Sequence, residues 1–378
     1  MKIIIAPDSY KDCLNASDVA DFMEAGVLKV LTDPQIIKIP IADGGEGTVK
    51  AIITGAGGRI VNTKTTGPLR NEIDSFFGVL ADGETAVIEM ASASGLELVP
   101  HNQRNPLNTT TFGTGQLILA ALDEGCKKII IGVGGSATTD CGMGMAQALG
   151  VVFYDSDRKP LSYGGRHMND VKYYDDSLLD PRINKAEIKV ACDVTNPLFG
   201  KRGAAYVYSA QKGASARQIR HLDDGLRNIS TVIQETSGTD ISCIPGSGAA
   251  GGLAGGLMAF TGAALVKGIE LVTDACHFSE KVKDADLVLT GEGSTDSQTA
   301  FGKVPVGIAS LAKKHLVPVI CISGALGKGY ETVYEKGIDA VFGIAPVPMS
   351  LDDSIKNAGQ NITDTTYNVI KTYISGIK

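Results

Sequence analysis

The stretch from residue 127 to residue 150 constrains the fold of this chain most, because its character changes twice within a few residues. Residues 129–133 are almost all β-branched and apolar, which predicts a strand that is buried on both faces. A loop rich in glycine, serine, threonine and aspartate follows, and a helix is predicted over residues 143–149, ending at Gly150. Strand, polar loop and helix in this order are typical of an α/β protein.

The loop of this stretch contains Gly134, Gly135, Ser136 and Thr138 before Asp140. Glycines at such a junction let the backbone approach a ligand closely, and the N–H groups at a helix start favour an anion such as phosphate. The loop matches neither the Walker A pattern nor GxGxxG. A tight turn that binds no ligand is the alternative, because glycine is common in turns of any function.

Length and composition limit the functions that fit. A chain of 378 residues predicts two domains, and its 46 glycines cluster at the ends of apolar runs, as in an ordered α/β protein. A net charge of −7 without a basic run argues against a nucleic acid or anionic membrane as partner. The seven cysteines form no CxxC pair and the first residues lack a signal-peptide pattern, so we expect a reduced, cytoplasmic protein with a small-molecule substrate.

The domain organisation follows from where strands alternate with helices. Both ends of the chain show strand, loop and helix in succession, which predicts a parallel sheet. Between residues 60 and 90, three short strands follow one another without helices, which predicts antiparallel pairing. We therefore expect a Rossmann-like α/β domain made of residues 1–64 and 285–378, with a mixed α/β domain, residues 65–284, inserted into it.

Four loops combine glycines with carboxylates or hydroxyls directly after a predicted strand, at residues 8–11, 43–48, 134–140 and 291–296. A fifth, residues 193–196, lacks the glycines. Helix caps and turns need one short polar residue each, so surplus acids at one sheet edge indicate a cation or a charged substrate. Carboxylates and hydroxyls suit Mg²⁺, and together with Lys11, Lys212 and Lys303 they predict phosphoryl transfer.

Nine motifs resemble those of the bacterial type I glycerate kinases, in the same order and over residues 2–346. They are APDS at residues 6–9, IADGGEGT at 41–48, TGPL at 66–69, EMASASGL at 89–96, GGSATTD at 134–140, CDVTNPL at 192–198, QKGA at 211–214, GAAGG at 248–252 and TGEG at 290–293. The resemblance implies an ATP- and Mg²⁺-dependent kinase that phosphorylates D-glycerate to 2-phosphoglycerate, with 3-phosphoglycerate as the other product to consider. It also implies two α/β domains with the active site in the cleft between them, a role in glycolate, glyoxylate or glucarate breakdown, and a monomer or homodimer.

The roles of individual residues in such a kinase are hypotheses. Asp193 is the first candidate for the catalytic base, and Asp43 and Glu292 are the next. The remaining candidate residues are grouped by the ligand that each is expected to bind. They are Asp8 and Asp296 for Mg²⁺; Lys11, Gly134, Gly135, Ser136, Thr138 and Lys303 for the phosphates; and Ser9, Gly44, Gly45, Asn196 and Lys212 for the substrate.

The chain departs from the family pattern after TGEG, where Ser294 and Thr295 stand in place of the usual basic residue, so another residue must supply that charge. Two other classes of protein share parts of the pattern. A two-domain binding protein for a small hydroxy acid would have a similar cleft without catalysis. A dinucleotide-dependent dehydrogenase would need GxGxxG after its first strand, which the loop at residues 6–9 does not provide.

Overall fold

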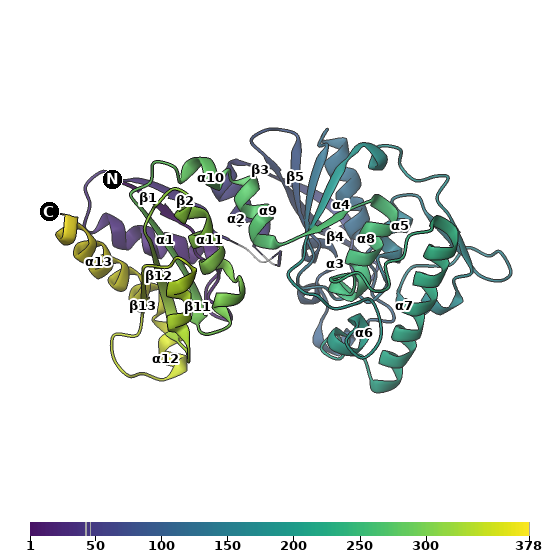
Figure 1. Cartoon of the computed structure of the whole chain (residues 1–378). Helices are drawn as coiled ribbons and strands as arrows, with labels where there is room; N and C mark the ends of the chain where they lie inside the picture. Colours follow the sequence, from purple (N-terminus) through teal and green to yellow (C-terminus); the bar gives the residue numbers. More distant parts are fainter. Residues whose placement is uncertain (42–43, 46, 378) are drawn as a thin grey trace. The chain divides into compact units, whose positions relative to one another are not determined.

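A computed structural model describes residues 1–41, 44–45 and 47–377 (Figure 1). The chain divides into two compact units, each with its own sheet and core. The first unit comprises Met1–Ala42, Lys50–Gly57 and Ile269–Lys378, and the second comprises Asp43–Val49 and Gly58–Gly268.

The first unit is built on a five-stranded sheet in which every pairing is parallel, in the order β13-β12-β11-β1-β2. Its strands are β1 (Lys2–Ile5), β2 (Gln35–Lys38), β11 (Leu287–Thr295), β12 (Val319–Leu326) and β13 (Ala340–Gly343). The expected α/β fold, with a parallel sheet formed by both ends of the chain, is therefore confirmed.

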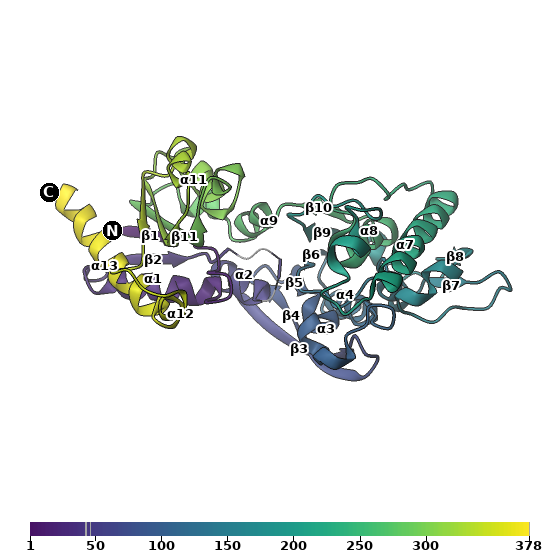
Figure 2. The same cartoon turned by 90° about the horizontal axis from the view of Figure 1, so that it is seen from below.

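Helices lie on both faces of this sheet. The helices of the unit are α1 (Ala16–Leu28), α10 (Phe278–Lys281), α11 (Val304–Lys313), α12 (Leu351–Lys356) and α13 (Ala358–Ile377), and α2 (Thr48–Ala56) and α9 (Gly268–Ala275) begin in the second unit and continue in the first. Apolar side chains of α1 and α13 pack together on β1, β11 and β12, and the two views place α11 on the opposite face (Figures 1 and 2). An N-cap fixes the start of α1, since the Asn15 side chain accepts a hydrogen bond from the Asp18 N–H.

Strand β11 differs from expectation, because it continues to Thr295 and so includes most of the loop expected at residues 291–296. Residues 290–295 pair in parallel with β12, with Glu292 opposite Ser323 and Thr295 opposite Leu326. Polar composition alone suggested a loop there, but the neighbouring strand β12 extends alongside these residues and supplies their hydrogen-bond partners.

The second unit contains a mixed six-stranded sheet in the order β10-β9-β6-β5-β4-β3. Its strands are β3 (Gly58–Thr66), β4 (Glu72–Leu80), β5 (Thr85–Glu89), β6 (Lys128–Gly132), β9 (Glu187–Ala191) and β10 (Ala264–Val266). The pairings β3–β4 and β4–β5 are antiparallel, as predicted, whereas β5, β6, β9 and β10 run parallel.

The helices of this unit are α3 (Ala91–Ser94), α4 (Phe112–Asp123), α5 (Met143–Ala148), α6 (Ala204–Tyr208), α7 (Ala216–Ser237) and α8 (Leu253–Thr261). A small antiparallel pair, β7 (Val152–Tyr154) and β8 (Tyr173–Asp175), lies beside a second apolar cluster that includes residues of α5, α7 and α8. Helix α8 begins only at Leu253, because Ala250 and Gly251 before it adopt left-handed conformations.

Apart from the short segment Asp43–Val49, the chain enters the second unit after residue 57 and returns to the first unit after residue 268. The expected boundaries, at 64/65 and 284/285, lie later in the chain. At the first boundary, β3 already pairs with β4 from Gly58 onwards. At the second, α9 and α10 pack within the first unit, where the Lys281 Nζ donates to the Gly55 carbonyl oxygen at 2.7 Å. Over the described residues, none of the helices combines the length and the apolar character needed to cross a bilayer.

Candidate active site

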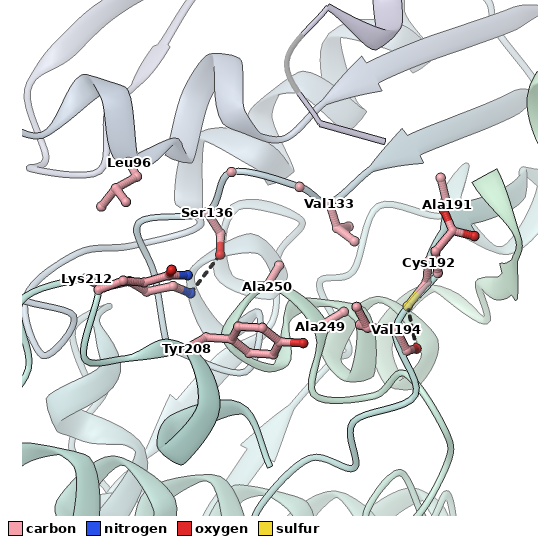
Figure 3. Close-up of a pocket in the computed structure, with 14 residues that line it drawn as sticks. Leu96, Val133, Ser136, Ala191, Cys192, Val194, Tyr208, Lys212, Ala249 and Ala250 are labelled. Atoms are coloured by element: carbon pink, nitrogen blue, oxygen red, sulfur yellow. Dashed lines mark hydrogen bonds between the residues drawn. The ribbon is translucent and has the colours of Figure 1, made fainter. Parts of the chain in front are cut away.

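A pocket of about 330 Å³ lies in the second unit at the carboxyl ends of β6 and β9, which are adjacent parallel strands (Figure 3). Ligands of α/β proteins bind characteristically at this edge of a parallel sheet, and the volume suits a small molecule. The pocket is lined by Leu96, Val133, Gly134, Gly135, Ser136, Ala191, Cys192, Asp193, Val194, Tyr208, Gln211, Lys212, Ala249 and Ala250.

Glycines at the end of β6 allow two segments of backbone to meet next to the pocket. The Gly134 N–H donates to the Gly44 carbonyl oxygen at 3.0 Å. A Cβ atom on Gly132 would lie 2.4 Å from that same oxygen, and one on Gly134 would lie 2.6 Å from the Gly45 Cα. These glycines are therefore required for close packing between chain segments. Asp43, the neighbouring candidate base, lies outside the described residues.

Lys212 is the pocket residue whose environment departs most from expectation, because a lysine in a loop is usually solvated. Its side chain is 2 % exposed. The Nζ atom donates to the Ser136 Oγ at 2.7 Å and to the Thr138 carbonyl oxygen at 2.6 Å. Burial lowers the pKa of Lys212 to about 7, and the negative charge of Asp140 opposes this shift only in part.

Asp140 corrects the prediction that the helix start after this loop binds phosphate. Its carboxylate accepts hydrogen bonds from the N–H groups of Gly142 and Gly144, which begin α5, and from the N–H and hydroxyl of Thr111. The Thr111 Oγ1 in turn accepts from the Met145 N–H. Burial raises the pKa of Asp140 despite these donors. The first turn of α5 is thus satisfied by the protein itself, so a phosphate there would have to displace a buried carboxylate.

Asp193 follows β9 and lines the same pocket, where it is exposed. Its Oδ1 accepts a hydrogen bond from the Gly268 N–H at 3.1 Å. Asn196, a candidate for contact with the substrate, is not among the residues that line this pocket. Its side chain instead accepts from the Tyr208 hydroxyl at 2.6 Å and donates to the Arg202 carbonyl oxygen, so it positions the tyrosine that forms one wall.

A second group of predicted residues gathers in the first unit around Glu292, which is 5 % exposed. Its carboxylate accepts from the hydroxyls of Thr299 at 2.6 Å and Thr295 at 3.1 Å. The Lys303 Nζ lies 3.5 Å from the Glu292 Oε2 and 3.9 Å from the Asp296 Oδ1. Burial raises the pKa of Glu292, while the two threonines and Lys303 oppose the shift.

The loop after β1, which contains Asp8, Ser9 and Lys11, lies against the strand that carries Glu292. The Asp8 N–H donates to the Gly291 carbonyl oxygen, and a Cβ on Gly293 would be 3.3 Å from the Lys11 N. The Asp8 Oδ1 accepts from the Ser9 N–H at 2.7 Å. All three residues therefore belong to the first unit's polar group.

The replacement of the usual basic residue by Ser294 and Thr295 has a structural consequence. The Thr295 hydroxyl contacts Glu292 and, at 2.6 Å, the Ser323 hydroxyl, so it supports the carboxylate from within the sheet. Lys303, at the start of α11, supplies the positive charge beside Glu292.

The structure thus brings the predicted residues together in two sets, one in each unit. Tyr208 and Gln211 line the pocket but were not among the candidate residues. A single tyrosine carries no distinguishing pattern in a sequence, whereas Gln211 opens the QKGA motif, which could have indicated it. In the part of the chain that the structure describes, no three His, Cys, Asp or Glu side chains cluster as a metal site. Mg²⁺ in kinases commonly uses only one or two protein carboxylates together with phosphate oxygens, so Asp8 or Asp296 still fits that role.

The position at the strand ends, and a small pocket lined by one lysine and one carboxylate, define an α/β enzyme that acts on a small molecule. The model of the glycerate kinase family matches residues 3–374. The chain therefore belongs to the glycerate kinase family, and it is a kinase.

Individual relatives are similar to this chain over nearly its whole length. The glycerate 2-kinase of Escherichia coli K12 is 47% identical over 378 residues, which cover 100% of this chain and 99% of the relative. The glycerate kinase of Halalkalibacterium halodurans is 48% identical over 367 residues, 97% of each chain. A crystal structure of a protein named as glycerate kinase 2 from Salmonella typhimurium LT2 superimposes with a TM-score of 0.89 at 48% identity, covering 100% and 99% of the two chains. The family resemblance of the motifs is thereby confirmed.

Proposed function

We propose that this kinase transfers the γ-phosphoryl group of ATP to the C2 hydroxyl of D-glycerate, giving 2-phosphoglycerate. The observation that carries this proposal is the pocket at the ends of β6 and β9, which offers one buried cation, Lys212, and one carboxylate, Asp193. The position of the product phosphate rests on the 47% identity with the Escherichia coli glycerate 2-kinase. We place the reaction in the cytoplasm, in glycolate, glyoxylate or glucarate breakdown, and the protein as a monomer or homodimer.

Asp193 is proposed as the general base, with Glu292 and Asp43 as the next candidates. The Asp193 carboxylate lines the pocket and is exposed to it, so it can accept the proton of the attacking hydroxyl. The hydroxyl oxygen forms a bond to the γ-phosphorus while the bond from that phosphorus to the β–γ bridging oxygen breaks, and ADP leaves. The substrate proton resides on Asp193 until it is released to solvent.

Phosphate contacts are proposed for Lys11, Lys303 and the loop backbone of Gly134, Gly135, Ser136 and Thr138. Lys303 is half-exposed and anchored by Glu292, which leaves its ammonium group available for an anion. Mg²⁺, held by Asp8 or Asp296 together with phosphate oxygens, would neutralise charge on the transferring group. Among the described residues, the Asp296 Oδ2 accepts no hydrogen bond, since the Gln298 N–H and Lys303 both face Oδ1, and this supports Asp296.

A phosphorus NMR spectrum of the purified protein with ATP, Mg²⁺ and D-glycerate tests the proposal. We expect a new phosphomonoester signal that requires all three components. A doublet from one neighbouring proton identifies the 2-phosphate, whereas coupling to two protons identifies the 3-phosphate. Intact ATP with no new signal would contradict the proposal and favour a binding protein for a small hydroxy acid, the reading that the kinase relatives otherwise disfavour.

A further inference from the structure

Lys212 has an unusual set of partners for a buried cation. Its ammonium group has three N–H donors, and two of them are used by neutral acceptors, the Ser136 hydroxyl and the Thr138 carbonyl oxygen. Among the described residues, no carboxylate lies within ion-pair distance of it. The nearby Asp140 carboxylate offsets the burial of this charge only in part. A buried charge without a directly paired counter-ion is costly, so this arrangement persists most readily where a ligand supplies an anion.

The position of the lysine shows where that anion would bind. Lys212 and Ser136 lie on one side of the pocket, and Cys192 and Val194, which flank Asp193 in the chain, lie on the other (Figure 3). Of the described residues that line the pocket, Lys212 is the one cation and Asp193 the one acid. One positive charge balances a single carboxylate, whereas a triphosphate would require several cations.

We propose that Lys212, held by Ser136 and Thr138, binds the carboxylate of the substrate and thereby selects monoanionic 2-hydroxy acids over neutral polyols. This assignment rests on the proposed function, because it takes the acceptor of the phosphoryl group to be a small hydroxy acid. With the carboxylate at Lys212, the hydroxyl of the same molecule is directed towards the opposite wall, where Asp193 lies. The pocket then recognises its substrate at two points of opposite charge.

Isothermal titration calorimetry with D-glycerate, in the presence of Mg²⁺ and a non-hydrolysable ATP analogue, tests the assignment. Lys212→Met retains the length of the side chain and removes its charge, and Lys201→Gln, an exposed lysine of the same unit, serves as the matched control. We expect Lys212→Met to weaken D-glycerate binding by about 10²-fold or more, because it deletes the charged partner of a buried anion. Lys201→Gln should bind D-glycerate like the wild type, and both variants should bind the ATP analogue unchanged.

The other outcomes are also decisive. An unchanged affinity for D-glycerate in folded Lys212→Met would overturn the assignment. A loss of affinity for the ATP analogue alone would also overturn it, because Lys212 would then bind phosphate. If Lys212→Met does not fold, Ser136→Ala replaces it, because this change removes one hydrogen-bond acceptor of the ammonium group. Ser136→Ala should lower the affinity for D-glycerate and leave the affinity for the neutral polyol glycerol unchanged. An affinity for D-glycerate equal to that of the wild type would reject the proposal. Failure of the wild type to bind D-glycerate at all would instead contradict the proposed function.

Discussion

Lys212 carries its charge at a cost to the folded protein, because its side chain is almost fully buried and faces only neutral acceptors. Its pKa is lowered from 10.5 to about 7. Between these two values the unfolded chain binds more protons at this position than the folded chain does. The free energy of unfolding therefore rises with pH between these two values. The penalty for burying the charged lysine is fully removed only above the ordinary lysine pKa.

We accordingly expect the wild type to gain stability relative to Lys212→Met as the pH rises from 7 to 9, by roughly 2 kcal/mol. Urea titrations of both proteins at the two pH values, followed by circular dichroism, measure the difference in apparent free energy of unfolding. A difference between the two proteins that is independent of pH would show that Lys212 stays protonated throughout.

At Asp193 the prediction concerns turnover. Asp193→Asn keeps the size of the side chain and removes its ability to accept a proton, so kcat should fall by about 10²–10⁴-fold with little change in KM. Steady-state kinetics with D-glycerate and ATP measure both constants. Asp157→Asn, at an exposed position of the same unit, should retain wild-type rates. Full activity of Asp193→Asn would move the role to Glu292 or Asp43.

At the scale of elements, the pocket depends on how closely β6 approaches the segment at residues 44–45. The Gly134 N–H bonds to the Gly44 carbonyl oxygen, and the space beside Gly132 is already filled by that same carbonyl group. The two segments are far apart in the chain and meet backbone to backbone. The close approach of these segments, beside the pocket residue Gly134, therefore depends on the absence of side chains at the end of β6.

Gly132→Ala tests this contact, because its Cβ would lie 2.4 Å from the Gly44 oxygen, and backbone must shift to admit it. We expect at least a tenfold loss in kcat/KM for D-glycerate, because small misplacements of binding groups are costly in catalysis. Gly376→Ala in α13, where a Cβ meets no atom within 4 Å, is the matched control and should keep wild-type kinetics. Wild-type kinetics in Gly132→Ala would show that the contact is not needed by the site.

For the whole molecule, each unit has its own apolar core. One cluster joins α1, α13 and strands of the parallel sheet, and it includes Leu289. The clusters of the second unit are built from other elements, with Leu117 of α4 among the fully buried members. Chains organised in this way commonly depart from a single two-state transition.

Core truncation should therefore act locally. Leu289→Ala and Leu117→Ala should each cost about 2–5 kcal/mol, because both side chains are fully buried. Hydrogen exchange measured by mass spectrometry should show the lost protection in β1 and β11 for Leu289→Ala, and in β5 and β6 for Leu117→Ala. Equal loss of protection in both units for either variant would indicate a single cooperative structure.

Local pattern alone determined the type of most elements and the family of this protein. The apolar run at residues 129–133 predicted β6, and the succession of strand, loop and helix at both chain ends predicted the parallel sheet, because such patterns are properties of neighbouring residues. Motif order identified the glycerate kinase resemblance, which the family match confirmed. The sequence also singled out Lys212 and Asp193, both of which line the pocket.

Only the tertiary structure decided what these residues do, because their environments are formed by distant segments. Thr290–Thr295 is strand since β12 pairs with it, and Asp140 serves the start of α5 since Thr111 and the helix N–H groups enclose its carboxylate. Lys212 is a buried cation because Ser136 and Thr138, some seventy residues earlier, supply its acceptors. Burial, pairing and charge balance depend on contacts across the fold, which no local pattern encodes.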